Sequence, residues 1–183
     1  LFELGYTPIL LDNCSNSSKS IIQQINLISG KECIFYEGDM RDKAFLRSIF
    51  NKHQIGGVIH FAAFKAVAES VEKPLHYYDN NVAGTVTLCR VMRDVNVKKL
   101  VFSSSATVYG DAKQVPITES APRSATNPYG QSKLMLEYIL ADLQASDPSW
   151  RIAILRYFNP VGAHESGLIG EDPNGPPNNL MPF

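Results

Sequence analysis

Short apolar runs alternate with amphipathic stretches along the whole chain, and this alternation is what most restricts its fold. Residues 57–63 form an almost uninterrupted apolar run, which is typical of a parallel strand covered on both faces. The pattern predicts strands at residues 6–11, 33–36, 58–63, 99–104 and 151–156 and helices at residues 20–28, 43–53, 74–96 and 128–145. Strands that alternate with helices predict an α/β fold with a doubly wound parallel sheet.

The composition is that of one soluble domain. The chain has 183 residues, of which 44% are hydrophobic and 19% charged, and this is enough apolar material for a core. With a net charge of -1, it offers no basic surface for nucleic acid, and no apolar run is long enough to span a membrane. Cys14, Cys33 and Cys89 are too widely spaced to indicate disulfides or zinc. We expect a cytoplasmic protein without a metal and without nucleic-acid or membrane partners.

Both ends of the chain look like interior positions of a longer sequence. Position 1 is Leu rather than Met, and residues 1–5 read as the last turn of a helix closed by Gly5. Residues 176–183 follow a loop rich in glycine and proline, where another element would be expected to start. We therefore expect a fold that is truncated at both ends.

Polar residues follow several of the predicted strands, namely Asp12, Asp39, Lys65 and residues 103–105. Because ligands bind at the carboxyl edge of an open parallel sheet, these residues are candidates for a site. In a dinucleotide-binding sheet, an acid in the position of Asp12 binds the adenosine ribose and repels a 2′-phosphate, which favours NAD over NADP. Asp12 is equally well explained as the start of a turn or a helix cap. The phosphate-binding glycines of a Rossmann-like fold would lie upstream of residue 1.

Tyr129 and Lys133 are candidate catalytic residues because their spacing places them on one face of a predicted helix. A phenol has a pKa near 10, and lowering it by about three units requires roughly 4 kcal/mol of differential stabilisation of the phenolate. A nearby ammonium and an oxidised nicotinamide can supply this. Ser105, at the end of a predicted strand, would hydrogen-bond the same substrate hydroxyl.

The same Tyr-x-x-x-Lys spacing occurs a second time, at Tyr109 and Lys113. Tyr109 precedes Gly-Asp in a predicted loop, so Lys113 need not return to the same face. Pro128 precedes Tyr129 and is typical of the first position of a helix. We therefore favour Tyr129 as the catalytic tyrosine.

The candidate residues lie in segments that follow one another through the whole chain. These segments are Asp12-Asn13, Glu37-Gly38-Asp39, residues 58–63, YYDNNV at 77–82, SSSATVYG at 103–110, PYGQSK at 128–133, LRYFNPVGA at 155–163 and PNNL at 177–180. Together they resemble the UDP-glucose 4-epimerases, which are extended short-chain dehydrogenases/reductases. The resemblance implies a Rossmann-like NAD-binding domain over residues 1–157 and the start of a substrate-binding region over residues 158–183.

The resemblance also implies roles for individual residues. Tyr129 would be the catalytic base, Lys133 would contact the nicotinamide ribose, and Ser105 would contact the sugar hydroxyl. The implied NAD contacts are Asp12, Asn13, Cys14, Ser15, Asn16, Ser17, Asp39, Met40, Phe61, Ala62, Ala63, Phe64, Lys65, Asn80, Ser103, Tyr129, Lys133 and Phe158. The implied contacts with the UDP-sugar are Ser105, Tyr129, Asn159, Asn179 and Leu180.

The implied reaction is the interconversion of UDP-galactose and UDP-glucose, an isomerisation in galactose metabolism. Tyr129 takes the proton of the sugar C4 hydroxyl while hydride passes from C4 to NAD. The 4-keto sugar then turns over, and hydride returns to its opposite face. By analogy we expect a homodimer that pairs through the helices at residues 74–96 and 128–145, and an isolated chain that is marginally stable and inactive.

Two other functions stay open. A dehydratase or decarboxylase of the same fold would act on other nucleotide sugars, but a dehydratase would need a carboxylate pair after Ser105, where this chain has Ala106-Thr107. A silent NAD-binding sensor would be expected to lose Tyr129 or Lys133, and the chain keeps both.

Overall fold

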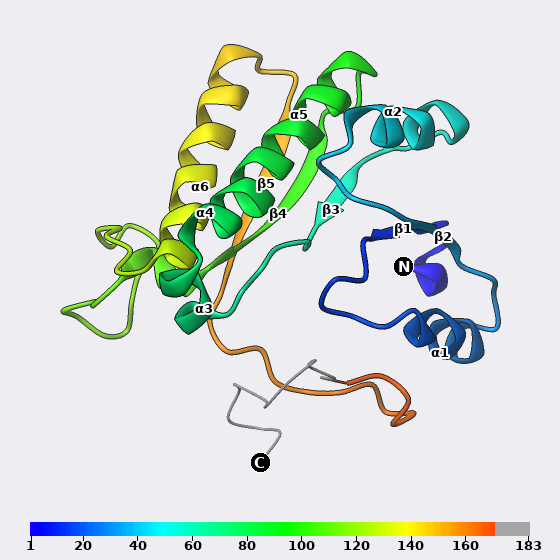
Figure 1. Cartoon of the computed structure of the whole chain (residues 1–183), viewed down its shortest axis with the longest axis horizontal. Coiled ribbons are helices and arrows are strands. Elements are labelled where there is room, and N and C mark those ends of the chain that lie inside the picture. Colours follow the sequence, from blue (N-terminus) through cyan, green and yellow to red (C-terminus); the bar gives the residue numbers. More distant parts are fainter. Residues whose placement is uncertain (171–183) are drawn as a thin grey trace. The chain divides into compact units, whose positions relative to one another are not determined.

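Strands and helices alternate through residues 1–170, which are the residues that the computed structural model describes (Figure 1). The strands are β1 (Ile9–Asp12), β2 (Ile34–Glu37), β3 (Val58–His60), β4 (Lys99–Ser105) and β5 (Arg151–Tyr157). The helices are α1 (Ser20–Ser29), α2 (Lys43–Lys52), α3 (Val67–Glu72), α4 (Pro74–Tyr77), α5 (Gly84–Asp94) and α6 (Pro128–Ser146), with shorter 3-10 or π segments η1 (Phe2–Leu4), η2 (Tyr78–Ala83) and η3 (Ala106–Tyr109). The strand pairs are parallel, so the predicted α/β class is confirmed.

Several elements differ from the predictions. β1 begins at Ile9 rather than residue 6, in keeping with the missing N–H of Pro8, which cannot donate to a strand ladder. β3 ends at His60 rather than residue 63, because the chain then leaves the sheet and bonds to a helix. Residues 74–96, predicted as one helix, form α4, η2 and α5 in succession. The apolar pattern does not predict α3, whose six residues are too few to show a helical period.

The chain divides into two compact units, and the first consists of Leu1–Asp39 with the chain from Asn159 onward. Its strands β1 and β2 pair from Ile9 opposite Ile34 to Asp12 opposite Glu37. Gly5 closes η1 in the left-handed conformation, with φ of 80°, so the predicted glycine stop is confirmed, although the turn before it is a 3-10 helix. Among the described residues of this unit, only Cys33 is buried.

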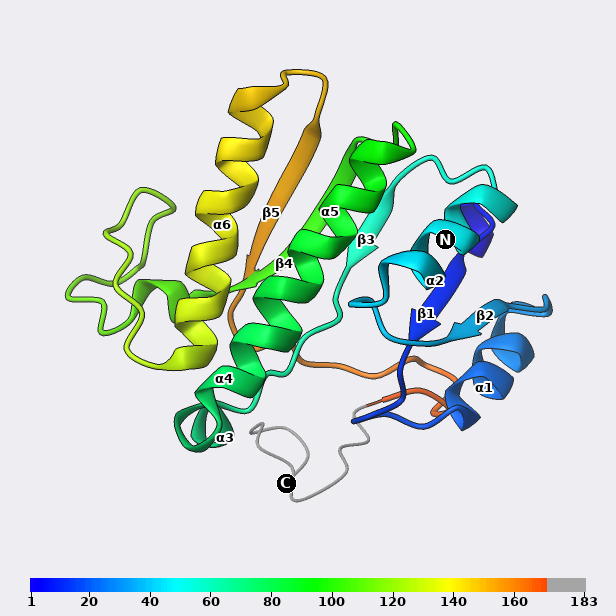
Figure 2. The same cartoon turned by 45° about the horizontal axis from the view of Figure 1, so that its top comes forward.

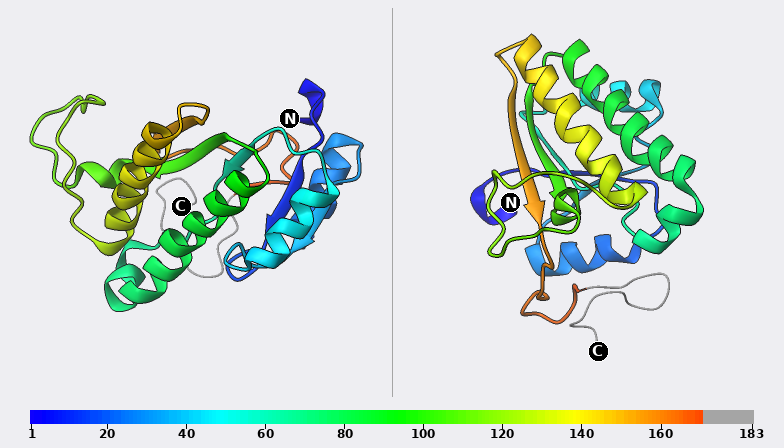
Figure 3. Two further views of the ribbon diagram at one scale, coloured as in Figure 1. Left: turned by 90° about the horizontal axis from the view of Figure 1, so that it is seen from above. Right: turned by 90° about the vertical axis from the view of Figure 1, so that its left-hand side faces the viewer.

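The second unit, Met40–Phe158, contains most of the buried residues and a three-stranded parallel sheet in the order β3-β4-β5. Helices α5 and α6 cover one face of this sheet (Figures 2 and 3). Leu100, Phe102 and Ser104 of the central strand β4 are buried. Since alternate residues of a strand point to the same face, these three side chains share one side, and Ser104 bonds to Glu137 of α6 there. In the part of the chain that the structure describes, no helix is both long enough and apolar enough to cross a bilayer.

Candidate active site

Ser105 is the last residue of β4 and is held in place by its own hydrogen bonds. Its hydroxyl oxygen accepts bonds from the backbone N–H of Thr107, at 3.2 Å, and from the Thr107 hydroxyl, at 2.9 Å. These bonds cap the short helix η3 that follows the strand. Ser105 is only 8% exposed, so a buried and oriented hydroxyl stands at the carboxyl end of the central strand of this unit.

Tyr129 lies in the first turn of α6, and the sequence starts this helix with strong local signals. The side chain of Asn127 accepts a hydrogen bond from the N–H of Gly130, at 2.8 Å, and Pro128 occupies the first helical position. A side chain at Gly130 would lie 3.0 Å from the carbonyl oxygen of Thr107. Glycine at this position therefore lets the helix approach η3 closely, immediately beside Tyr129.

Lys133 is one helical turn after Tyr129 and is buried, with 3% exposure. Its Nζ donates a 2.8 Å hydrogen bond to the carbonyl oxygen of Ser103. The same atom lies 6.0 Å from the centre of the Tyr129 ring and 5.0 Å from that of Phe102. The structure therefore brings Tyr129 and Lys133 together beside the end of β4, as the sequence predicts.

Burial shifts the proton affinities of both groups. It raises the pKa of the Tyr129 phenol, while a hydrogen bond with Ser105 acts in the opposite direction. It lowers the pKa of the Lys133 ammonium to about 8. The phenol is thus protonated at neutral pH in the protein alone, and a further positive charge is needed to make Tyr129 an effective base.

The loop after β3 is held by a buried asparagine that the sequence analysis did not single out. The side-chain oxygen of Asn81 accepts the backbone N–H of Phe64, at 2.9 Å, and its amide nitrogen donates to the Phe64 carbonyl, at 3.0 Å. The same amide donates to Ser132, whose hydroxyl donates to the carbonyl of Tyr129. Asn81 thus ties the loop to the helix that carries the candidate residues Tyr129 and Lys133. The only sequence signal is its place beside Asn80 in the motif at residues 77–82.

Asn80 and Asn81 both lie in the π segment η2. Such segments often occur at functional sites, because the extra residue in the turn redirects side chains. Asn80 is 6% exposed and donates to the side-chain oxygen of Asn81, at 3.0 Å. The predicted NAD contact Asn80 is therefore oriented by the same residue that fixes the loop.

In the first unit, Asp12 forms a tight turn. One oxygen, Oδ1, accepts the N–H of Cys14, at 2.7 Å, and the Ser17 hydroxyl, at 3.0 Å. The turn that is one of the two explanations of Asp12 from the sequence is therefore present. Within residues 1–170, the other oxygen, Oδ2, makes no hydrogen bond with the protein. It is available to a ligand hydroxyl.

The rest of this acidic cluster is polar and open. Asn13 donates to Asp39, at 3.3 Å, and accepts the N–H of Ser15, at 3.0 Å. Ser15 and Asn16 are exposed, whereas Cys14 and Ser17 are half-buried. The polar groups predicted for this end of the chain therefore form one local cluster.

The remaining predicted residues fall into different environments. Met40 is buried, and its side chain lies close to Gly84 of α5, where it would be 2.5 Å from any added Cβ. Phe61 and Phe158 are exposed after β3 and β5, by 62% and 57%, and the Phe61 ring centre is 6.4 Å from that of Tyr157. Ala62, Ala63, Lys65 and Asn159 are not buried. Asn179 and Leu180 lie outside the described residues.

Tyr109, the second tyrosine with the same spacing, has a structural role. It is 4% exposed, and its hydroxyl accepts a 2.6 Å hydrogen bond from Arg156, whose guanidinium group also lies 5.0 Å from the ring centre. Lys113 lies exposed in the loop after η3. The hydroxyl of Tyr109 is therefore engaged by Arg156. The choice of Tyr129 as the candidate base is consistent with this geometry.

We expect Tyr109→Phe to lower stability rather than abolish activity. A hydrogen bond from a charged donor contributes about 1.5–3 kcal/mol, so the free energy of unfolding should fall by about 1–2 kcal/mol. Turnover should remain within about threefold of wild type, since Tyr109 does not touch Ser105 or Lys133 through any of its bonds. Urea unfolding and a turnover assay would check this. A loss of turnover as severe as that of a Tyr129 variant, from a folded protein, would show that Tyr109 is the base.

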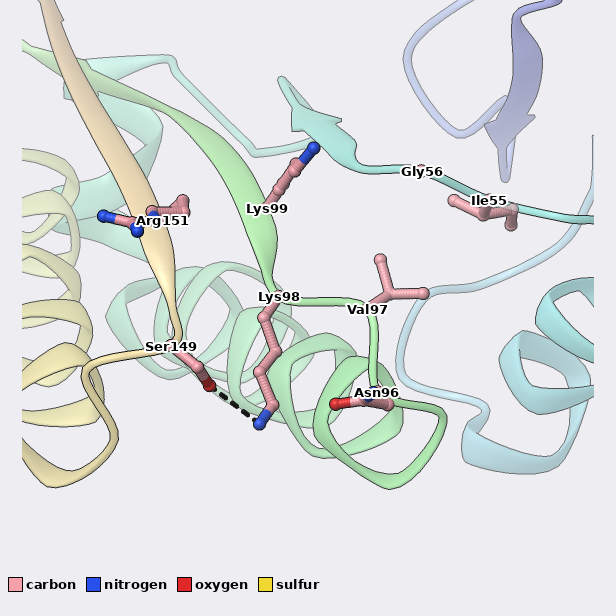
Figure 4. Close-up of a pocket in the computed structure, with 8 residues that line it drawn as sticks. All are labelled: Ile55, Gly56, Asn96, Val97, Lys98, Lys99, Ser149 and Arg151. Atoms are coloured by element: carbon pink, nitrogen blue, oxygen red, sulfur yellow. Dashed lines mark hydrogen bonds between the residues drawn. The ribbon is translucent and has the colours of Figure 1, made fainter.

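A cavity of about 400 Å³ lies at the opposite end of the sheet from Ser105 (Figure 4). It is lined by residues at or just before the amino ends of β3, β4 and β5, namely Ile55, Gly56, Asn96, Val97, Lys98, Lys99, Ser149 and Arg151. Lys98 is bonded to Ser149 and paired with Asp147, each at 2.9 Å. Figure 4 shows the side chains of Lys99 and Arg151 pointing in different directions. Because these cationic side chains do not point toward a common position, they do not form a binding site for an anion.

Metal-ligating residues do not gather anywhere in the described part of the chain. No group of three or more His, Cys, Asp or Glu side chains that could hold a metal occurs in residues 1–170. His60 is buried and bonds to the hydroxyl of Thr85, at 2.8 Å. Burial and the nearby Lys133 lower its pKa to about 3, so His60 is a neutral interior side chain.

Curated proteins named UDP-glucose 4-epimerase are similar to this chain over its whole length. The chain is 58% identical over 184 residues to a UDP-glucose 4-epimerase of Yersinia pestis, covering 100% of this chain and 54% of the relative. It is 60% identical over 183 residues to one of Dictyostelium discoideum, covering 100% of this chain and 53% of the relative. The chain thus spans about half the length of the curated relatives that it matches.

Solved structures show the same similarity. A UDP-glucose 4-epimerase of Bifidobacterium longum in complex with NAD+ and UDP has a TM-score of 0.96 and 55% identity, covering 100% of this chain and 55% of that chain. One from Stenotrophomonas maltophila, with bound NAD and formylated UDP-arabinopyranose, has a TM-score of 0.97 and 46% identity, covering 100% of this chain and 54% of that chain. The family model described as GDP-mannose 4,6 dehydratase matches residues 1–181. On this match over nearly its whole length, the chain belongs to the GDP-mannose 4,6 dehydratase family.

Proposed function

We propose that the protein interconverts UDP-galactose and UDP-glucose with the help of bound NAD. The observation that carries this proposal is the grouping of Ser105, Tyr129 and Lys133 at the end of β4. The relatives named UDP-glucose 4-epimerase support the choice of substrate.

The residues present fit a dinucleotide. The free oxygen of Asp12 suits a ribose hydroxyl, and the raised pKa of Tyr129 calls for a positive charge of the kind that an oxidised nicotinamide carries. We propose that Asp12–Ser17, Asp39, Met40, residues 61–65, Asn80, Ser103, Tyr129, Lys133 and Phe158 hold NAD. When bound, NAD would accept hydride from sugar C4 and return it. The NAD-bound structures of similar epimerases support this assignment.

The chain's own residues would then handle the proton. The phenol oxygen of Tyr129 takes the proton of the C4 hydroxyl as C4 becomes a carbonyl, and it gives this proton back when C4 is reduced. Ser105 donates a hydrogen bond to the sugar oxygen and holds it in line with Tyr129. Lys133, when protonated, favours the phenolate by its charge. Asn159, Asn179 and Leu180 are proposed to contact the UDP-sugar.

Return of the hydride is favoured over elimination of water. Elimination would need an acid and a base at the sugar ring, and the residues that follow Ser105 are Ala106, Thr107 and Val108 in η3. The hydroxyl of Thr107 is bonded to Ser105. The chain therefore lacks a carboxylate at the place where a dehydratase of this fold would be expected to have one, although the matching family model carries the name of a dehydratase.

The test is turnover of UDP-galactose by protein expressed from its complete reading frame and purified without added NAD. Proton NMR should show UDP-glucose appearing until the two sugars reach equilibrium, with no net consumption of NAD. A folded protein that stays inactive when NAD is supplied would overturn the UDP-galactose assignment. Formation of a 4-keto-6-deoxy sugar instead would establish the dehydratase.

We also propose that the protein forms a homodimer through the helical face of the second unit. Leu75 of α4 is 81% exposed, and Met135 and Tyr138 of α6 are 39% and 50% exposed. Large apolar side chains exposed on helices are candidates for an interface. Sedimentation velocity should give twice the monomer mass, and the double variant Leu75→Glu, Met135→Glu should give the monomer. A wild-type monomer at micromolar concentration would contradict the proposal.

The division of the chain into two regions is part of the same proposal. Residues 1–157 would form the NAD-binding domain, and residues 158–183 would begin the substrate-binding region.

A cytoplasmic location agrees with the free state of Cys14, Cys33 and Cys89. Fractionation of cells, with the protein detected by antibody, would test this location.

A further inference from the structure

The most buried carboxylate among the described residues belongs to Glu137, which lies one helical turn after Lys133 on α6 and is 1% exposed. Its oxygen Oε1 accepts the Ser104 hydroxyl, at 2.6 Å, and Nε of Arg156, at 2.9 Å. Its other oxygen accepts Arg156, at 2.8 Å, and Arg123, at 2.9 Å. Burial alone would raise the pKa of this carboxyl, but the bonds from Arg156, Ser104 and Arg123 hold it below its ordinary value. Glu137 is therefore a charged and fully bonded group inside the protein.

The bond from Ser104 reaches the strand end that carries the candidate catalytic serine. Three consecutive residues of β4 meet α6 or its first turn. The Ser103 carbonyl accepts Lys133, Ser104 donates to Glu137, and Ser105 interacts with Tyr129. Ser104 points to the side of the sheet that α6 covers, and Ser105 follows it in the chain. The hydrogen bonds of Lys133 and Glu137, which lie one helical turn apart on α6, thus fix the position of this helix along β4.

Arg156 and Arg123 anchor the carboxylate from two other directions. Arg156 comes from β5, and its guanidinium group also donates to the Tyr109 hydroxyl and to the Glu119 carbonyl, at 2.9 Å. Arg123 comes from the loop before α6 and is bonded to the same carboxylate oxygen as Arg156. With both arginines in place, Glu137 has little freedom to follow a movement of the helix, so its bond to Ser104 acts as a rigid tether.

We propose that Glu137 is a positioning residue of the reaction, which acts through Ser104 to keep Tyr129 and Lys133 in register with Ser105. The inference rests on the proposed epimerase function. Catalysis depends on the distance between the phenol and the sugar hydroxyl that Ser105 holds, and a misplacement of about 1 Å can lower a rate by about a hundredfold. A fully satisfied buried polar network makes a core rigid, so the bond between Ser104 and Glu137 is suited to holding this distance constant.

Ser104→Ala is the sharpest test, because it removes the tether and leaves Glu137 with both arginines. In protein from the complete reading frame, we expect kcat for UDP-galactose to fall about tenfold or more. The KM and the NAD bound per chain should stay within about twofold of wild type. The acid limb of the kcat–pH profile should also move to higher pH, because a weaker bond from Ser105 raises the pKa of Tyr129. Ser104→Thr, which keeps the hydroxyl, should restore most of kcat.

The matched control is Ser70→Ala. Ser70 is also fully buried, and its hydroxyl donates a 2.6 Å bond to the Val67 carbonyl in α3. It therefore measures what the loss of one buried hydroxyl costs in stability, and it should leave kcat and the pH profile unchanged. If Ser104→Ala matches wild type or Ser70→Ala in kcat and pH profile, the positioning role is overturned. Wild-type protein without epimerase activity overturns the proposed function as well, so the two failures are distinct.

Discussion

Replacement of Tyr129 by Phe is expected to lower UDP-galactose turnover by about three orders of magnitude or more without unfolding the protein. Under the proposed function, the variant loses the group that takes and returns the C4 proton, and general acid–base catalysis contributes about 10²–10⁴-fold. The phenyl ring keeps the packing of Tyr129, and the Asn127 cap and Pro128 start α6 independently of the hydroxyl. The loss should therefore fall on kcat, with NAD content and circular dichroism unchanged.

Tyr138→Phe is the matched control for this experiment. Tyr138 lies on the same helix and is half exposed, so the change removes an identical hydroxyl away from the strand end. Its kcat should equal that of wild type. Activity above about a tenth of wild type in Tyr129→Phe would rule out Tyr129 as the base and would direct attention to Tyr109.

Replacement of Lys133 by Met is expected to abolish turnover and yet stabilise the protein freed of NAD. Burial lowers the pKa of Lys133 from an ordinary 10.5 to about 8, and this shift corresponds to about 3 kcal/mol of unfavourable burial of the charge. Met has similar length and no charge, so urea unfolding at pH 7 should show a gain of up to about 3 kcal/mol. The stabilisation by charge that the reaction needs is lost at the same time.

The pH dependence of stability gives an independent check of the same residue. Below pH 8, Lys133 is protonated in both the folded and the unfolded protein, and the full penalty of the buried charge is present. Between about pH 8 and 10.5, the unfolded chain binds more protons than the folded one, so wild-type stability gains from rising pH. The difference between Lys133→Met and wild type should therefore shrink over this range. A difference that is independent of pH would mean that Lys133 is not buried as a cation.

Much of the fold could be predicted from local patterns. The apolar runs and the helix start signals at Pro128 locate the strands and α6 to within a few residues. The predicted lengths of β3 and of the helix at residues 74–96 are wrong, because tertiary contacts determine where these elements end. β3 ends at His60, because the backbone of Phe64 forms its hydrogen bonds with the side chain of Asn81. Residues 74–96 include a π segment, in which Asn80 and Asn81 are buried.

By itself, the sequence determined the α/β class and the candidate catalytic residues, because periodicity and the spacing of Tyr129 and Lys133 act within one or two turns of the chain. It left Tyr109 and Asp12 with two readings each. Only the tertiary structure showed that Arg156 occupies Tyr109, and that Asp12 makes a turn with one oxygen while the other remains available. The roles of Asn81 and Glu137 were decided there too, since their partners are up to 51 residues away in the chain. Hydrogen bonds between such distant side chains leave no periodic trace in a sequence, because they depend on how helices and strands are packed.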